Sequence, residues 1–124
     1  MRQRLARFWQ DRRGASAVEF AIVVPLLGAL TIGAINLCIL VYMDARLQFA
    51  VDGAARCGAI GTCTATSQAA SSFGFASLSP TFSVPVSANC HGTKVTGTVT
   101  YPLNAVLASF SIPLTASSCF AAQG

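Results

Sequence analysis

An uncharged apolar run from Phe20 to Met43 constrains the fold of this chain more than any other feature. As a helix rising about 1.5 Å per residue, a run of this length reaches about 36 Å, which is enough to cross the roughly 30 Å hydrocarbon layer of a bilayer with some tilt. Charged residues make up only 10% of the 124-residue chain, which agrees with a membrane protein rather than a water-soluble globule. We therefore expect one membrane-spanning helix, and the remaining length leaves room for one small domain at most.

Most of the positive charge precedes this apolar run. The formal net charge is +4, and five arginines stand before Gly14 against a single acid, Asp11, whereas the three bases and three acids from Ala15 onward cancel. Short segments rich in Lys and Arg stay on the cytoplasmic side of a membrane, so we expect a cytoplasmic N-terminus and a C-terminal part outside. No nucleic-acid-binding motif accompanies the basic segment, and we predict no nucleic-acid partner.

The N-terminal segment does not fit a cleaved secretory signal. The apolar run is longer than the core of a typical signal, which has about 7–15 residues. The small triplet Ala15-Ser16-Ala17 also precedes the run, whereas signal peptidase cuts after it. An uncleaved signal anchor stays open as an alternative.

A helical pattern continues beyond the apolar run. Apolar or small residues recur at spacings of three and four at Leu47, Val51, Ala54 and Gly58, whereas the charged residues fall largely off that stripe. The pattern predicts one long helix, apolar at first and amphipathic later, over residues 15–60. Pro25 should kink this helix, because proline removes a backbone donor and crowds the preceding turn.

The segment after the helix predicts a small head that contains β-structure. We expect a helical turn over residues 67–73, capped by Thr66 or Ser67 and ended by Gly74. An edge strand is expected over residues 81–87, since Pro85 cannot donate to a central ladder.

A second strand is expected over residues 94–101. There Val95, Val99 and Tyr101 alternate with threonines, and residues 89–93 provide a turn before the strand. Residues 104–111 fit either a strand or a helix. The sequence therefore predicts an α+β fold, with a basic leader over 1–14, a transmembrane and amphipathic helix over 15–60, and a small periplasmic head with a β-hairpin over 61–124.

Five cysteines are present, and four of them follow the apolar run. Cys38 lies inside the run as a small buried hydrophobe. In an oxidising compartment the other four suggest two disulfides, for which three pairings exist. The preferred hypothesis pairs Cys57 with Cys63, at the end of the helix, and Cys90 with Cys119, across the hairpin and the C-terminus.

Other chemistry has weak support in the sequence. His91 is the only histidine, and its position directly beside Cys90 is awkward for a zinc site, so we predict no metal and no cofactor. The serines lack an acid-oriented base, and no phosphate-binding loop is present. We therefore predict that the protein is not an enzyme.

Glu19 is the one charged residue between Ala15 and Met43. Because a charge within a bilayer is costly, although less so near the interface, Glu19 is either a snorkelling interfacial acid or a functional group. Cleavage after Gly14 would make Ala15 a new N-terminus and Glu19 the fifth residue. At a separation of about 4 Å and an effective dielectric of about 20, the new amine and the carboxylate would attract by roughly 4 kcal/mol. The amine of one subunit could also meet the glutamate of the next, which would fix the axial register of neighbouring helices.

The residues around Glu19 resemble a known family. In RRGASAVEFAIVVPLL, a basic leader ends at Gly14, Ala15 follows, Glu19 is succeeded by an aromatic residue, and an early proline stands at Pro25. This pattern is similar to that of TadE-like proteins, the minor pilins or pseudopilins of the Tad (Flp) pilus system. The resemblance continues through INLCILVYMDARLQFAVDGAARCGAI and is weak after Ile60.

The resemblance implies a bacterial prepilin-like protein that a prepilin peptidase cuts between Gly14 and Ala15. The implied partners are that peptidase, other Tad pilins and assembly-platform proteins of the inner membrane, in which the chain would be a single-pass protein with a periplasmic head. The implied role is structural, in pilus biogenesis and surface adhesion, and leaves open whether the protein enters the extracellular pilus, primes it or stays in the membrane. The alternative is an uncleaved single-pass signal-anchored protein whose periplasmic head binds a protein partner.

Overall fold

The computed structural model describes residues 15–87, 89–104 and 108–122. The chain divides into two compact units, residues 1–35 and 36–124, which meet inside the long helix α2. The predicted leader over 1–14, including Gly14, lies outside the described residues. We describe each unit by itself.

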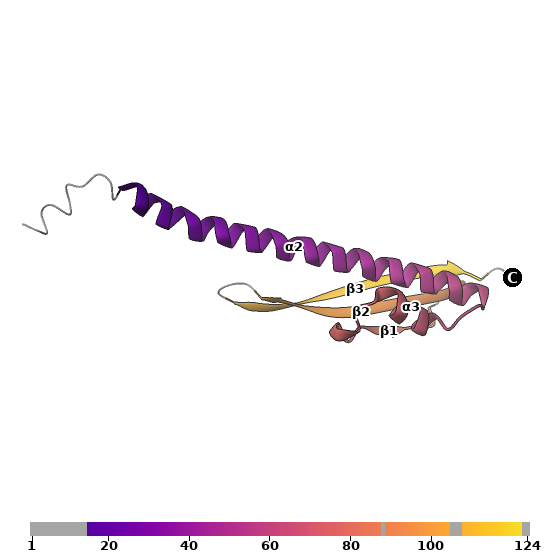
Figure 1. The fold of residues 1–124 in the computed structure, drawn as a ribbon. Coiled ribbons are helices and arrows are strands. Elements are labelled where there is room, and N and C mark those ends of the chain that lie inside the picture. The colour runs from indigo at the N-terminus through magenta and orange to yellow at the C-terminus, as the bar shows by residue number, and fades with distance from the viewer. Residues whose placement is uncertain (1–14, 88, 105–107, 123–124) are drawn as a thin grey trace, which may run out of the picture. The chain divides into compact units, whose positions relative to one another are not determined.

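Helix α2 runs from Ala15 to Ile60 and contains 46 residues, as the sequence predicts (Figure 1). The helical assignment continues without a break through Pro25, so this proline does not end the helix, and the kink stays a prediction. In the first unit, the side chains from Ser16 to Ile35 are exposed, with Gly28 half-buried. This part of the helix is apolar on all sides, which is typical of a segment surrounded by lipid or by other helices.

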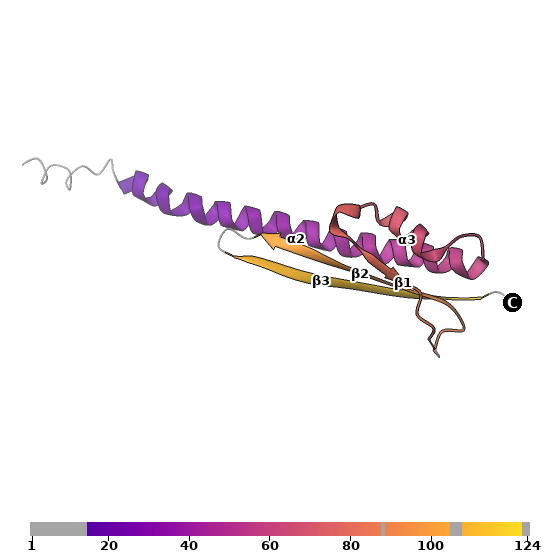
Figure 2. The same cartoon turned by 90° about the horizontal axis from the view of Figure 1, so that it is seen from below.

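The second unit contains α2 from residue 36 onward and five further elements. They are α3 (Ala65–Phe73), the 3₁₀ turn η2 (Ala76–Leu78), β1 (Thr81–Ser83), β2 (Gly92–Asn104) and β3 (Ser109–Ala121). The three strands form one antiparallel sheet in the order β1-β2-β3, and Figure 2 shows them side by side in one layer. β2 and β3 pair along their whole length, from Gly92 opposite Ala121 to Asn104 opposite Ser109. The structure therefore has the α+β fold that the sequence predicts.

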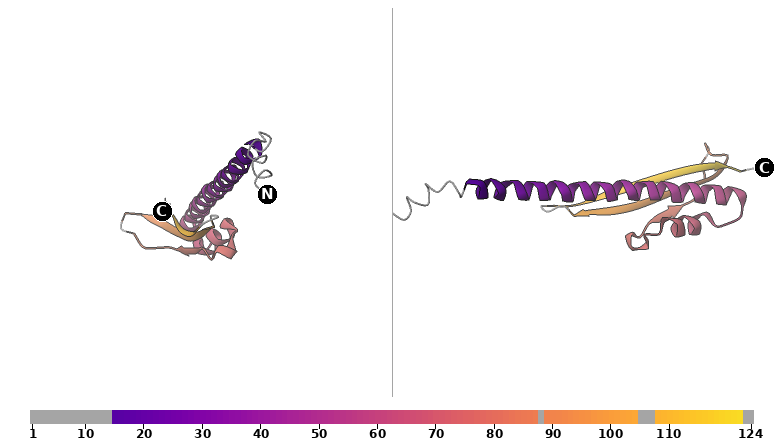
Figure 3. Two further views of the ribbon diagram at one scale, coloured as in Figure 1. Left: turned by 90° about the vertical axis from the view of Figure 1, so that its left-hand side faces the viewer. Right: turned by 45° about the horizontal axis from the view of Figure 1, so that its top comes forward.

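The core of the second unit lies between the sheet and the two helices. Its buried side chains come from all three parts: Met43, Leu47, Ala50, Val51, Ala54 and Ala55 of α2, Ala65, Ala69 and Phe73 of α3, and Val95, Val99 and Ala116 of the sheet. Both helices cover the face of the sheet that carries Val95 and Val99, while Thr98 and Thr100 on the opposite face are exposed (Figure 3). The small alanines let α2 approach the sheet closely.

Gly97 lies where α2 approaches the sheet closely. A Cβ placed on Gly97 would lie 3.0 Å from Cγ2 of Val51 and 2.8 Å from Cε1 of Phe82. Neither neighbour has room to move freely, because Val51 is fully buried and Phe82 stacks edge-on against Phe73 with ring centroids 6.3 Å apart. The helix can pack here because glycine has no side chain.

Several details of the head differ from the sequence prediction. Helix α3 begins at Ala65 with Thr64 at its N-cap, so a cap at Thr66 or Ser67 was wrong; instead the Ser67 hydroxyl donates to the Thr64 carbonyl oxygen at 2.9 Å. The helix does end at Gly74, which adopts a left-handed φ of 77°. The expected edge strand over 81–87 ends at Ser83, before the Val84-Pro85 pair, and β2 extends beyond the expected 94–101 at both ends.

Candidate functional site

The first half of α2 is the largest apolar surface that the structure describes. Between residues 18 and 35, ten large apolar side chains are 44% to 71% exposed: Val18, Phe20, Ile22, Val23, Val24, Leu26, Leu27, Leu30, Ile32 and Ile35. Burying a side chain of this size is worth about 1.5–3 kcal/mol. Together these residues would strongly favour transfer of the helix from water into lipid or a bundle of helices. By length and composition, α2 is the one described helix that could cross a membrane.

Glu19 stands at the N-terminal border of this apolar surface. It is the fifth residue of α2, and its side chain is exposed. Residues four apart on a helix lie on the same face, so Glu19 shares a face with Ala15, the first residue of α2. Gly14 lies outside the described residues, so the structure does not test the predicted cleavage site or the pairing of Glu19 with an amine at Ala15.

Small residues leave open notches further along the same segment. A Cβ placed on Gly28 or on Gly33 would meet nothing within 4 Å. The hydroxyl of Thr31 donates to the Gly28 carbonyl oxygen at 2.9 Å, which satisfies the polar side chain within its own helix. Such notches allow the backbone of a second helix to come close.

Arg46 ties the second half of α2 to α3. One terminal nitrogen of its guanidinium donates to the carbonyl oxygens of Ser72 and Phe73, at 3.1 and 3.3 Å. These carbonyls belong to the last turn of α3, where a helix leaves acceptors without intrahelical partners. Sequence reasoning placed Arg46 off the apolar stripe and missed this role, and an arginine just after a long apolar run was the only signal.

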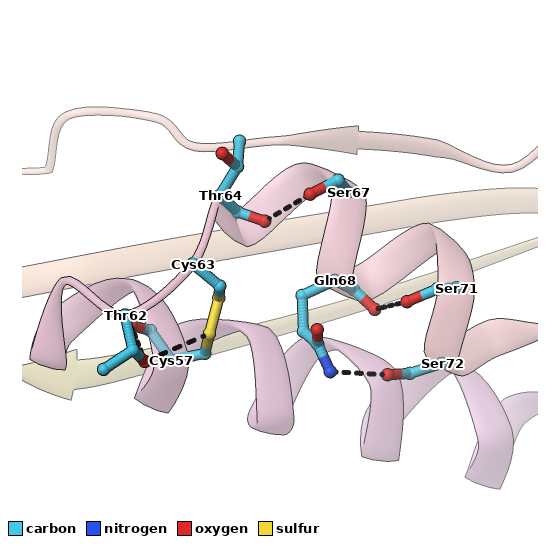
Figure 4. The surroundings of a disulfide bond; sticks show 8 residues. All are labelled: Cys57, Thr62, Cys63, Thr64, Ser67, Gln68, Ser71 and Ser72. Atoms are coloured by element: carbon cyan, nitrogen blue, oxygen red, sulfur yellow. Dashed lines mark hydrogen bonds between the residues drawn. A yellow bond between two sulfur atoms is a disulfide. The ribbon is translucent and has the colours of Figure 1, made fainter.

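The structure joins Cys57 to Cys63 and Cys90 to Cys119, which is the pairing preferred from the sequence. The Cα atoms are 5.7 Å apart in the first pair and 6.0 Å apart in the second. The first bridge ties the end of α2 to the loop before α3 (Figure 4). The second connects the segment before β2 to β3. Cys38 is a free thiol and is exposed on α2, rather than buried as the sequence reading had it.

The described residues show no arrangement suited to metal chemistry. Among residues 15–87, 89–104 and 108–122, no three His, Cys, Asp or Glu side chains are placed to hold a metal ion together. Cys90, the neighbour of His91 in the weak zinc hypothesis, is committed to a disulfide.

Among the described residues, one helix is long and apolar enough to cross a membrane, and a small disulfide-linked α+β part follows it. These two features define the class of this protein. Within that class, residues 14–56 match the family model described as TadE-like protein. The match confirms, for this segment, the TadE-like family expected from the sequence. The family implies a role in assembly of the Tad pilus, is generally non-enzymatic, and suggests other Tad pilus components as partners. No curated protein and no solved structure matched the chain.

Proposed function

We propose that this protein is a minor pilin of a Tad pilus, processed by a prepilin peptidase and involved in pilus biogenesis and surface adhesion. The observation that carries the proposal is the position of Glu19, the single acid between Ala15 and the end of the uncharged run at Met43. The family match begins at Gly14, the residue after which the peptidase would cut.

Cleavage would supply the positive group that Glu19 lacks. The chain contains no other charge between Ala15 and Met43 that could pair with this acid. The α-amine created at Ala15 would lie one helical turn from Glu19, within the same subunit or against the glutamate of a neighbour. In a lipid-like core with an effective dielectric of about 20, such a pair at ~4 Å attracts by roughly 4 kcal/mol. An acid left without a partner there would oppose packing, so the pairing selects one axial register.

The remaining features support an inner-membrane location with the head in the periplasm. Basic residues precede the span, as in segments retained in the cytoplasm. The two disulfides lie in the unit after the span, and disulfides persist in oxidising compartments such as the periplasm. Gly28 and Gly33 would let sister helices approach, and Pro25 would kink the span to fit them.

The partners follow from this placement. The prepilin peptidase would act at the cytoplasmic face, and other Tad pilins and the assembly-platform proteins would contact the exposed apolar half of α2. The head would stand outside the membrane, where a partner surface of the pilus or of the cell envelope is accessible.

The intact mass of the protein extracted from its own membranes tests the processing. We expect loss of residues 1–14, with or without a methyl group on the Ala15 amine. A full-length species in assembled pili would contradict the proposal and favour an uncleaved signal-anchored protein whose head binds a periplasmic partner.

A further inference from the structure

The last described pairs of the β2–β3 hairpin carry apolar side chains although they extend past the core. Tyr101 and Ile112 are paired across the strands, and Leu103 and Phe110 form the next pair on the same face. Tyr101 packs against the core, but Phe110 is 59% exposed. Leu103 is half-buried and is not among the side chains that pack on the core, so Phe110 is the member of this pair that is left exposed. An exposed phenylalanine beside a leucine favours another apolar surrounding.

Two contacts fix how the hairpin lies along the second half of α2. A Cβ on Gly58 would lie 2.9 Å from Cγ2 of Thr93, and a Cβ on Gly97 would lie 3.0 Å from Cγ2 of Val51. β2 therefore runs antiparallel to α2, as Figure 1 also shows for this unit. The four-residue step from Thr93 to Gly97 covers about 13 Å of strand, and the seven-residue step from Gly58 to Val51 covers about 10 Å of helix. The two steps are therefore similar in length.

Extending this correspondence between β2 and α2 places the two tyrosines of the chain at the same level along the α2 axis. Tyr101 lies four residues beyond Gly97, which corresponds to a level of about residues 42–44 of α2. Tyr42 stands at that level, one residue before the end of the uncharged run. Tyrosine is enriched where a membrane meets water, so a membrane boundary at this height would suit both side chains.

The hairpin end reaches past this boundary. Leu103 lies two residues further than Tyr101, which corresponds to a level of about residues 37–41 of α2, within the apolar run. Phe110 is directly opposite Leu103. No charged residue and no histidine occurs from Val95 to the C-terminus, so no charge in this strand pair opposes contact with the membrane interface.

We propose that the Leu103–Phe110 pair of the β2–β3 hairpin dips into the outer face of the bilayer, below the level of Tyr42 and Tyr101. This inference rests on the proposed membrane span of α2. The insertion is shallow, because both strands have unpaired backbone groups near the hairpin end and such edges do not enter hydrocarbon. β1 pairs only with Thr96–Thr98 of β2, which leaves the later part of β2 uncovered. The head is thereby held against the membrane at two points, α2 and the hairpin.

Quenching of single tryptophans by brominated lipids tests the inference. The full chain, with its sole tryptophan replaced by Trp9→Phe, carries one of four substitutions: Phe110→Trp, Leu103→Trp, Val86→Trp or Leu30→Trp. Each variant is placed in phosphatidylethanolamine–phosphatidylglycerol vesicles with or without phosphatidylcholine brominated near the headgroup end of its chains. Val86 is a matched apolar control, fully exposed in the loop at the opposite end of β2. Formation of both disulfides verifies that each variant folds.

We expect emission at shorter wavelength and about a two-fold loss of intensity for the indole introduced by Phe110→Trp or Leu103→Trp, because both would sit in the interface. The indole at position 86 should show neither change. Quenching at position 30 without quenching at positions 110 and 103 would overturn the inference and leave the span intact. No quenching at position 30 would overturn the span and the inference together. A shift to shorter wavelength at position 110 without quenching would assign the hairpin end to a protein neighbour, such as a second copy, and would also overturn the inference.

Discussion

The two halves of α2 belong to one continuous helix, but the first half exposes large apolar side chains and the second half buries mostly small ones. From Val18 to Ile35 the large apolar residues are exposed, whereas from Met43 to Ala55 the residues that are fully hidden are mostly small, including Ala50 and Ala54. A helix that is apolar all round needs an apolar solvent, and a helix with one small-residue stripe needs a single neighbour. The comparison teaches that the all-round hydrophobicity of the first half indicates an apolar environment. The buried alanines of the second half indicate a closely packed neighbour, which is the sheet.

The largest effect should come from emptying the core of the second unit. Phe73 is fully buried between α3 and the sheet, and Phe73→Ala should lower the free energy of unfolding of the head by about 3–5 kcal/mol. The matched change Phe20→Ala removes the same side chain from a position that is 71% exposed, and should leave head stability unchanged. Urea unfolding in detergent, followed by near-ultraviolet circular dichroism, compares the two. Equal losses would mean that the halves of α2 are not separate environments.

The disulfides should stabilise the head unequally, and leave the span untouched. They close loops with sequence separations of 29 and 6 residues. From chain entropy, replacing both Cys90 and Cys119 by serine should cost roughly 3.5 kcal/mol, and replacing Cys57 and Cys63 roughly 2 kcal/mol. The helix content of the span in detergent should be unchanged in both double variants. A larger loss of stability on removing Cys57–Cys63 than on removing Cys90–Cys119 would show that the entropy of the unfolded chain does not determine which disulfide stabilises the head more.

The glycines of the two halves should respond oppositely to one added methyl group. Gly97→Ala forces a Cβ against Val51 and Phe82 and should destabilise the head by about 1–3 kcal/mol. Gly33→Ala meets nothing within 4 Å, so the isolated protein should keep its stability while the notch for a sister helix is filled. Unfolding of both variants, together with counts of assembled pili, measures the contrast. An unchanged head stability in Gly97→Ala would contradict the close packing of α2 at Gly97. Normal pili in Gly33→Ala would contradict a helix contact at Gly33.

The smallest expected effect is the difference in stability loss between substitutions of Arg46 and Arg56, the two arginines in the second half of α2. Arg46→Leu leaves the carbonyls of Ser72 and Phe73 without their donor, at a cost of about 1–3 kcal/mol. Arg56 instead lies 5.3 Å from the ring centroid of Phe120 on the exposed side, and Arg56→Leu should cost about 0.5–1 kcal/mol. Amide hydrogen exchange in the last turn of α3 should rise in the first variant only. Unchanged exchange there would reject the capping role of Arg46.

The elements that the sequence predicts well are those with a strong local signal. The apolar first half of α2 and its amphipathic continuation follow from an uncharged run and from the spacing of Leu47, Val51 and Ala54, and the end of α3 follows from Gly74. The buried face of β2 follows from the alternation of Val95 with Val99. Each of these features depends on residues within a few positions of one another.

The features that the sequence did not reveal depend on distant partners. β3 reads SFSIPLTASSCFA, where serine, alanine and a proline hide the alternation of Ile112, Leu114 and Ala116, and pairing with β2 makes it a strand. Arg46 acts on carbonyls 26 and 27 residues away in the sequence. Local propensity cannot report contacts of this kind.

Glu19 offers the most direct test of the proposed function. In cells that make the pilus, Glu19→Gln removes the charge and keeps the shape of the side chain, and Asp52→Gln is a control on the head half of α2. The proteins are extracted, their intact masses are measured, and assembled pili are counted. We predict normal removal of residues 1–14 in both variants and a loss of pili for Glu19→Gln alone. Normal piliation in the processed Glu19→Gln variant would contradict the pairing of the acid with the new N-terminal amine.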